Sequence, residues 1–226
     1  MRLSVIVPTL NEASCIEETL TVVRDQNPDE IVISDAGSRD STTAIASNFG
    51  IVVEGEAGRA NQMNLGAATA TGDILVFLHA DTILPEDGLN IIRDTAMSVA
   101  PSGTFRLEFD NPHPLLRFSS FCTRFESLNI CFGDRCIFTN RETFDQVGGY
   151  PSIPIFEDVE FVKRIARLNQ FAFLKQSVLT SARRYHDAGV WTQQWKNTRL
   201  WLRYQRGADP VELAKEYRYE SRDDST

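Results

Sequence analysis

Two stretches of sequence decide the fold: LSVIVPTLNE at residues 3–12 and IVISDAGSRD at residues 31–40. Each begins with a short run of mostly apolar residues and then changes abruptly to small and polar residues. That pattern is typical of a buried strand that ends in a loop. A third stretch, DILVFLHAD at residues 73–81, repeats it, and the segments 13–24 and 40–49 carry apolar residues at helical spacing. Strands and helices therefore alternate in the first part of the chain.

The same alternation continues over the first hundred residues and then weakens. Further strands are expected at 51–54, 103–109 and 136–140, and further helices at 62–70, 117–128 and 157–168. Such alternation predicts a parallel, doubly wound α/β sheet whose binding loops lie at the carboxyl ends of the strands. No linker, internal repeat or low-complexity run interrupts the chain. We therefore expect a single domain.

The composition excludes several classes of protein. With 226 residues, 42% hydrophobic and 24% charged, the chain has the profile of a soluble globular protein. A net charge of −8 argues against nucleic acid as a partner, because such proteins neutralise many backbone phosphates. The four cysteines and three histidines lack the spacing of a structural zinc site. Neither a signal peptide nor an apolar run of membrane-spanning length is present, so we expect a cytoplasmic protein.

Acidic residues follow three of the expected strands: Glu12, Asp35 and Asp81. A carboxylate at the exit of a buried strand costs free energy unless it binds something. The ordinary alternative is a helix cap, which Asp35 or Asp81 would each provide for the helix that follows. Three acidic strand exits at one edge favour a ligand-binding crevice over three separate caps.

At five places the sequence resembles the inverting glycosyltransferases of family 2, which have the GT-A fold. The matching motifs, in the family's order, are VIVPTLNE at 5–12, ISDAGSRDST at 33–42, GRANQMNLG at 58–66, LHAD at 78–81 and FED at 156–158. The variants Asp-Ala-Gly-Ser and His-Ala-Asp resemble those of a compact bacterial subgroup. The resemblance implies a Rossmann-like, mostly parallel sheet flanked by helices in one domain.

The resemblance also implies how that domain is divided. Residues 1–218 would form it, with a nucleotide-binding half at 1–100, an acceptor half at 101–182 and a C-terminal helical segment at 183–218. The polar tail 219–226 is expected to be disordered.

The donor implied by the resemblance is a nucleotide diphosphate sugar, with a UDP-sugar favoured. A divalent cation, Mn²⁺ or Mg²⁺, would offset the charge that develops on the leaving diphosphate. Asp81 occupies the last position of the family's Asp-x-Asp metal motif and is therefore the expected ligand. His79 stands where the first Asp of that motif often is, either as a second ligand or as a neutral hydrogen-bonding residue beneath the loop.

Other motif positions imply contacts to the donor. The residues concerned are Pro8, Leu10, Glu12, Asp35, Arg59 and Asp134. The first three would line the base and ribose, and Asp35 would approach the base edge. Arg59 would contact the base or diphosphate, and Asp134 the sugar hydroxyls; a solvated loop charge and a plain turn are the respective alternatives. Arg183, Arg184 and His186 form a further polar cluster that would close over the diphosphate.

Glu157 and Asp158 open the expected helix at 157–168. Acids at a helix N-terminus interact favourably with its dipole, which is the structural alternative. In the family this place supplies the general base that takes the proton of the acceptor hydroxyl. The resemblance therefore implies Asp158 as base, Glu157 as a supporting group and inversion at the anomeric carbon.

Two other functions stay open at this point. A sugar-phosphate nucleotidyltransferase also combines an α/β sheet with metal-binding carboxylates, but it would need a glycine-rich loop after the first strand. A catalytically weak sugar-nucleotide-binding module is the non-enzymatic alternative, kept open by His79 and by Ala36, which replaces an Asp common in the family. The acceptor, a hydroxyl or carboxyl group, is unknown and includes lipid-linked molecules.

The segment 183–206 has six basic residues and one acid in a chain of net charge −8. Within it, Trp191, Trp195 and Leu202 recur at helical spacing beside the cations. One interpretation is a helix that packs its tryptophans into the core. The other is a helix at residues 191–206 that lies in a membrane interface, at the inner face of the membrane.

Overall fold

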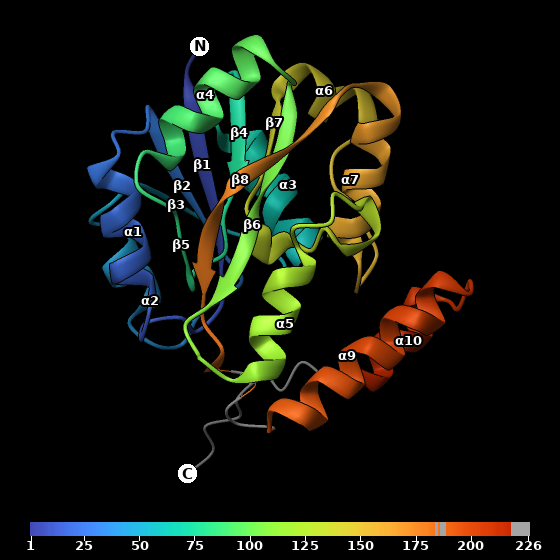
Figure 1. Cartoon of the computed structure of the whole chain (residues 1–226). Coiled ribbons are helices and arrows are strands. Elements are labelled where there is room, and N and C mark those ends of the chain that lie inside the picture. Colours follow the sequence, from blue (N-terminus) through green and yellow to red (C-terminus); the bar gives the residue numbers. More distant parts are fainter. Residues whose placement is uncertain (184, 186–188, 218–226) are drawn as a thin grey trace.

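In the computed structural model, which describes residues 1–183, 185 and 189–217, the strands form one mixed sheet of eight (Figure 1). From one edge to the other the strands are β3 (Ile51–Glu54), β2 (Glu30–Asp35), β1 (Leu3–Thr9), β4 (Ile74–Phe77), β7 (Ile137–Asn140), β6 (Ser102–Phe109), β8 (Phe171–Thr180) and β5 (Thr82–Ile83). The tail 219–226 lies outside the described residues.

The first four strands of this order are parallel, as the sequence predicts. β1 lies between β2 and β4, with Val7 opposite Ile33 and Val5 opposite Val76. β7 runs antiparallel to both β4 and β6, β8 is parallel to β6, and β5 is antiparallel to β8. Because β1, β2 and β4 end at the same edge, the polar loops that follow them meet there.

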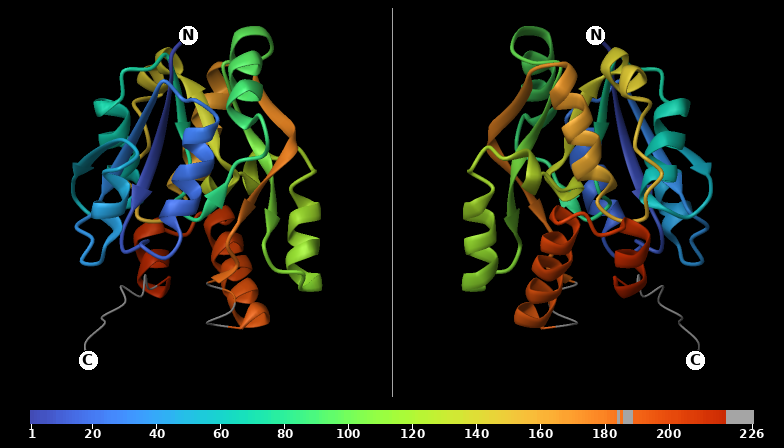
Figure 2. Two further views of the ribbon diagram at one scale, coloured as in Figure 1. Left: turned by 90° about the vertical axis from the view of Figure 1, so that its left-hand side faces the viewer. Right: turned by 90° about the vertical axis from the view of Figure 1, so that its right-hand side faces the viewer.

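Helices cover both faces of the sheet (Figure 2). α1 (Ile16–Asp25), α2 (Thr42–Ala46) and α4 (Gly88–Ser98) pack on one face, and α3 (Arg59–Thr69), α6 (Arg141–Val147) and α7 (Glu157–Leu168) pack on the other. This is the flanked α/β sheet expected from the sequence.

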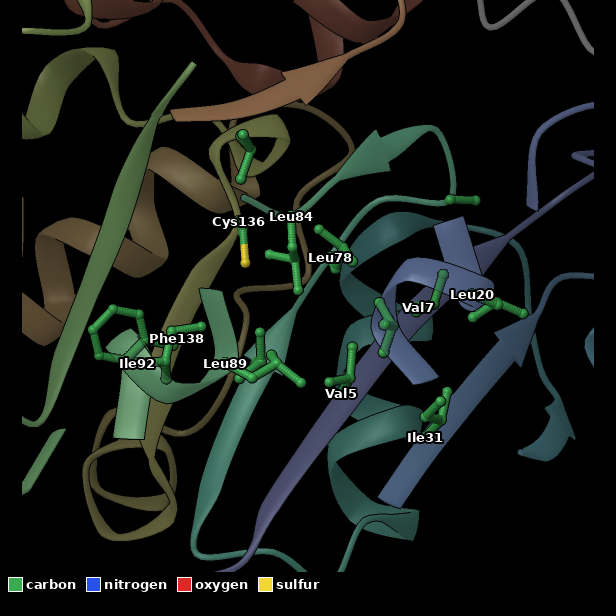
Figure 3. Packing of buried hydrophobic residues seen from close by; sticks show 14 of the residues in the cluster. Val5, Val7, Leu20, Ile31, Leu78, Leu84, Leu89, Ile92, Cys136 and Phe138 are labelled. Atoms are coloured by element: carbon green, nitrogen blue, oxygen red, sulfur yellow. The ribbon is translucent and has the colours of Figure 1, made fainter. Parts of the chain in front are cut away.

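A hydrophobic core lies on each face of the sheet, and alternate residues of β1 point into one core or the other. Val5 and Val7 point into the first, together with Leu20 of α1 and Leu89 of α4 (Figure 3). Ile6 points the other way, toward α3. A Cβ on Gly66 of α3 would lie 2.4 Å from the Ile6 side chain, so only glycine lets α3 approach the strand this closely.

Several expected boundaries were wrong. The helix expected at 117–128 is α5 (Pro114–Cys122), with His113 accepting a hydrogen bond from the Leu115 amide and Pro114 in the first turn. Three elements were not expected from the sequence: α4, α6 and the ten-residue strand β8. The helix expected at 40–49 is the five-residue α2.

The C-terminal helices α9 (Val190–Gln205) and α10 (Pro210–Glu216) pack together beside α5 at one end of the molecule (Figures 1 and 2). Their small core joins Leu200 and Leu213 to Ile155, Phe156 and Val159. The expected helix at 191–206 is confirmed. Within the described ranges, no helix is both long and apolar enough to cross a membrane.

Candidate active site

The loops after β1 and β2 form one wall of the site. The Asn11 amide donates to Ser38 Oγ at 2.8 Å, and Asn11 Oδ1 accepts from the Arg39 amide at 2.8 Å. Gln62 of α3 joins the strand ends from below, because its Nε2 donates to the Thr9 carbonyl at 2.8 Å and to the Ser34 carbonyl at 3.0 Å. Pro8 and Leu10 lie half-buried on this wall.

Asp35 is fully buried, and its carboxylate accepts four hydrogen bonds. The donors are Thr9 Oγ1, Ser38 Oγ and the amides of Gly37 and Ser38, at 2.5–2.9 Å. The helix-cap alternative is wrong for Asp35, since its partners lie in the loop and not in α2. Asp40, the residue before the N-cap Ser41, accepts from the Thr42 amide of the first turn of α2 at 3.0 Å. In this structure Asp35 fixes the shape of the loop that faces the site.

Glu12 joins the β1 loop to the chain that leaves β8. Arg183 Nη2 lies 2.6 Å from Glu12 Oε2, and its Nη1 donates to Ser14 Oγ at 2.9 Å. Burial acts to lower the pKa of Arg183, but Glu12 and, more weakly, Cys15 and Asp81 outweigh it, so the pKa is raised. Arg183 therefore lies among the acidic strand exits, whereas Arg184 and His186 of the same expected cluster lie outside the described residues.

Three carboxyl groups gather where α7 begins. Glu157 and Asp158 are only 4% and 7% exposed, and Asp134 lies in the 3₁₀ turn Gly133–Arg135. Asp158 Oδ2 accepts from the Gly133 amide, and its Oδ1 accepts from the Val159 amide at 2.7 Å. Arg59, the first residue of α3, reaches Glu157 with its Nη1 3.9 Å from Oε1.

These acids share a poorly solvated environment. Burial, reinforced by the charge of Asp158, raises the pKa of Asp134 to about 6 and that of Glu157 to about 7. Burial also raises the pKa of Asp158, against the Gly133 amide and Arg59, which lower it. Asp134 Oδ1 is buried and has no hydrogen-bond partner among the described residues. The cluster is therefore suited to accept a proton or a ligand donor near neutral pH.

His79 approaches the same cluster from the loop after β4. A Cβ on Gly133 would lie 2.9 Å from His79 Nε2 and 3.2 Å from Asp158 Oδ2. Gly133 thus separates the expected metal motif from the expected base, and only a glycine fits between them.

Asp81 is a half-buried residue of that same loop, and its charge contributes to the raised pKa of Arg183. Over the described part of the chain no group of three or more His, Cys, Asp or Glu side chains could enclose a metal. Mg²⁺ and Mn²⁺ commonly take one or two protein oxygens and complete their shell with phosphate and water. The donor set of Asp81 with His79 beside it fits a cation held in that way.

Backbone strain gathers around the site. Asn11, Cys136 and Phe156 have φ of 54°, 55° and 64°, a region that non-glycine residues rarely adopt. Asn11 lies in the β1 loop, Cys136 follows the Asp134 turn and Phe156 immediately precedes Glu157. Such strain is held only where the surroundings enforce it, and it is common at functional sites.

The residues that join the loops of the site through hydrogen bonds were not predicted from the sequence. Arg135 is 1% exposed and donates to the carbonyls of Phe105, Ile130 and Thr123. Asn64 accepts from the Tyr150 amide and donates to the Tyr150 carbonyl, both at 2.9 Å. The only signal for Gln62 and Asn64 was their place inside the motif at 58–66.

Sequence comparison finds relatives over the first part of the chain. Residues 4–98 match the model of the family described as glycosyl transferase family 2. An O-antigen chain rhamnosyltransferase of Salmonella typhimurium is 31% identical over 94 residues, 38% of this chain and 30% of that protein. Glucosyl-3-phosphoglycerate synthase of Mycobacterium tuberculosis is 33% identical over 96 residues, 37% of this chain and 30% of that protein. The chain thus spans about 30% of the length of these curated relatives.

Solved structures resemble the fold over a longer stretch. A mannosyltransferase from Pyrobaculum calidifontis, in complex with GDP-Man and Mn²⁺, aligns with a TM-score of 0.67 and 23% identity. The alignment covers 88% of this chain and 61% of that one. TarS of S. aureus aligns with a TM-score of 0.67 and 17% identity over 80% of this chain and 37% of that one. The expected GT-A fold is confirmed.

Proposed function

From a GT-A fold whose residues 4–98 match the model of glycosyl transferase family 2, we propose that the chain is an inverting, metal-dependent glycosyltransferase. It moves a sugar from a nucleotide diphosphate sugar, with UDP favoured, to a hydroxyl or carboxyl acceptor. The observation that carries the proposal is the buried acidic cluster at the edge where the loops after β1, β2 and β4 meet.

Asp158 acts as the general base in this proposal. Its raised pKa, caused by burial, strengthens it as a proton acceptor, and the Gly133 amide fixes one of its oxygens. The acceptor oxygen bonds to the anomeric carbon as its proton passes to Asp158. The bond from that carbon to the diphosphate oxygen breaks, and its electron pair leaves with the nucleotide. A single displacement of this kind inverts the anomeric centre.

Glu157 and Asp134 support the base. Glu157 holds Arg59 toward the cluster, and the guanidinium is then placed to meet phosphate oxygens. The unpartnered Oδ1 of Asp134 can accept a hydrogen bond from a sugar hydroxyl. Pro8, Leu10 and Glu12 line the nucleoside, and Asp35 shapes the loop beside its base.

Asp81, with His79 beside it, would hold Mn²⁺ or Mg²⁺. Such a cation supplies charge neutralisation for the leaving diphosphate. The approach of His79 Nε2 to Gly133 also supports a second role, in which a neutral imidazole braces the loop that carries the base.

The acceptor in this proposal is carried on a lipid, and the enzyme works at the cytoplasmic face of a membrane through residues 191–206. The outward position of Trp191 and Trp195, described below, supports this part of the proposal.

The test is a panel of UDP- and GDP-sugars with and without Mn²⁺. Binding is scored by the rise in apparent stability, about 2.7 kcal/mol at a hundredfold excess over Kd, and chemistry by release of the nucleoside diphosphate. Metal-dependent release contradicts the pure binding module, whereas formation of a nucleotide sugar from a sugar phosphate and a nucleoside triphosphate would favour the nucleotidyltransferase. Absence of binding across the panel contradicts the proposal.

A further inference from the structure

Two neighbouring helices leave large aromatic side chains in water. On α5 and just after it, Phe118, Phe121 and Phe125 are 62%, 51% and 60% exposed. On α9, Trp191 and Trp195 are 70% and 73% exposed. The interpretation that these tryptophans pack into the core is therefore wrong. We call these five rings the aromatic face.

The two groups of rings belong to one end of the molecule. α5 and α9 pack against each other, and the His113 ring that caps α5 lies 6.1 Å from the Trp191 ring. Both views in Figure 2 show these helices side by side at one end of the molecule. Exposed aromatic residues gathered in this way mark a surface that meets a partner.

The charge around the aromatic face is positive. Residues 113–125 and 189–206 contain six Arg or Lys and no Asp or Glu, in a chain of net charge −8. Glu216 of α10 pairs with Arg199 and Arg203, so these two arginines are already partly neutralised. Arg117 and Arg124 have no ion pair among the described residues.

Those two arginines open onto a groove beside α5. With Arg106 of β6 they line a groove of about 750 Å³ that also includes Phe121 and the acids Glu108 and Asp110. Asp110 accepts a hydrogen bond from the Ala182 amide at 2.7 Å, and the three arginines exceed the two acids of the groove. An arginine fork binds phosphate oxygens well, and the adjacent ring offers an apolar contact. The groove therefore suits an anionic headgroup at the margin of an apolar phase.

The inner side of α9 leads directly to the acidic cluster. Tyr204 stacks on Phe156 with ring centroids 4.6 Å apart, and its hydroxyl donates to Glu160 Oε2 at 3.2 Å. Phe156 is the residue before Glu157. The side of α9 that carries Tyr204 thus packs on a residue two positions before the proposed base, Asp158.

We propose that the aromatic face docks on an anionic phospholipid bilayer. The rings enter the interfacial region, where amphipathic aromatic side chains are favoured, while Arg117, Arg124 and Arg106 meet lipid phosphates. Residues 113–125 and 189–206 contain cations and no acids, so an anionic surface is the partner that complements their charge. The proposal rests on the proposed function only for the reason to dock, a lipid-carried acceptor, and it is tested without sugar transfer.

The experiment measures binding of the full chain to vesicles of phosphatidylcholine with phosphatidylglycerol, against vesicles of phosphatidylcholine alone. Co-sedimentation with the anionic vesicles, weakening as salt rises, is expected, together with a blue shift of tryptophan emission. Arg117→Gln with Arg124→Gln should weaken binding about 25-fold, at about fivefold per cation. Trp191→Ser with Trp195→Ser should weaken it at least about tenfold.

The matched control is Arg167→Glu with Leu168→Ala, which changes an exposed cation and an exposed apolar residue at the far end of α7. It should bind vesicles like the wild type, and all variants should keep the thermal shift with UDP and Mn²⁺. No binding to anionic vesicles at low salt, or equal loss in the control, overturns the proposal. A wild-type dimer that the tryptophan variant converts to a monomer also overturns it, since the face would then join two copies. If the wild type binds anionic vesicles but does not bind UDP, the proposed function is contradicted and the docking proposal is still supported.

Discussion

Replacing Asp158 by Asn tests the acidic cluster most directly. The amide keeps the size of the side chain, and its oxygen can still accept from the Gly133 amide, so the fold should survive. A buried negative charge disappears, which lowers the pKa of Glu157, because the charge of Asp158 is the second cause of its rise to about 7. The NH₂ group of the new side chain cannot accept from the Val159 amide, so the gain from losing a buried charge is offset and stability should stay within about 1–2 kcal/mol of the wild type. No group at position 158 can then take the acceptor proton.

The expected loss of transfer is about 10²–10⁴-fold, the usual contribution of a general base, or roughly 3–5 kcal/mol in the barrier. Donor binding should be unchanged, because Asp158 touches Gly133 and Val159 rather than the nucleotide wall. The base works only when deprotonated, so wild-type activity should rise with pH through the upper apparent pKa of the coupled Glu157–Asp158 pair. The variant should lose that rise.

Rates are measured by release of the nucleoside diphosphate, binding by calorimetry and the product anomer by proton NMR. Asp145→Asn, at an exposed position on α6, is the matched control and should transfer at the wild-type rate. Transfer by Asp158→Asn within about threefold of wild type, or a product that keeps the donor's anomeric configuration, would refute the reasoning.

Four further changes have clear expected outcomes. Asp81→Asn should abolish the Mn²⁺-dependent part of UDP affinity in calorimetry and leave the melting temperature unchanged. Gly133→Ala should cost about 1–3 kcal/mol in chemical denaturation, because its Cβ would lie 2.9 Å from His79 Nε2. Arg135→Met should cost about 3–5 kcal/mol, since three buried carbonyls lose their donor; a loss under about 1 kcal/mol would contradict this. Burial raises the folded-state pKa of Glu157 from 4.5 to about 7, so ionisation of this side chain disfavours the folded state. The free energy of unfolding should therefore fall as pH rises across that window. In urea unfolding measured at several pH values, Glu157→Gln should make this fall smaller.

The sequence predicted those elements whose pattern depends on burial alone. β1 and β2 are continuous apolar runs because both of their faces are covered, and α7 has a strong apolar stripe beneath an acidic first turn. β8 was missed because much of it is partly exposed, so its residues show no clean alternation. It is a long strand only because β6 pairs along its length.

Contacts between distant residues were beyond sequence reasoning. Glu12 and Arg183 are 171 positions apart, and Asn64 and Tyr150 are 86 apart. Neither pair has a local pattern that would identify its partner. The exposure of Trp195 was equally unpredictable, because a periodic stripe shows which residues share a face and not what that face meets.

Hydrogen bonding separates the structural acids from the functional ones at this edge of the sheet. Asp35 is fully buried, yet four donors satisfy its oxygens, so it needs no ligand and serves to fix its loop. Asp134 is the reverse case, with a buried oxygen that no described residue satisfies and a pKa raised to about 6. A fold selected for stability alone would replace such a group with an apolar one, because an unsatisfied buried acceptor costs about 1–3 kcal/mol. The cost is understandable if a ligand's hydroxyl supplies the missing donor, which is why the cluster of Asp134, Glu157 and Asp158, rather than the better-bonded Asp35, is the centre of the proposed chemistry.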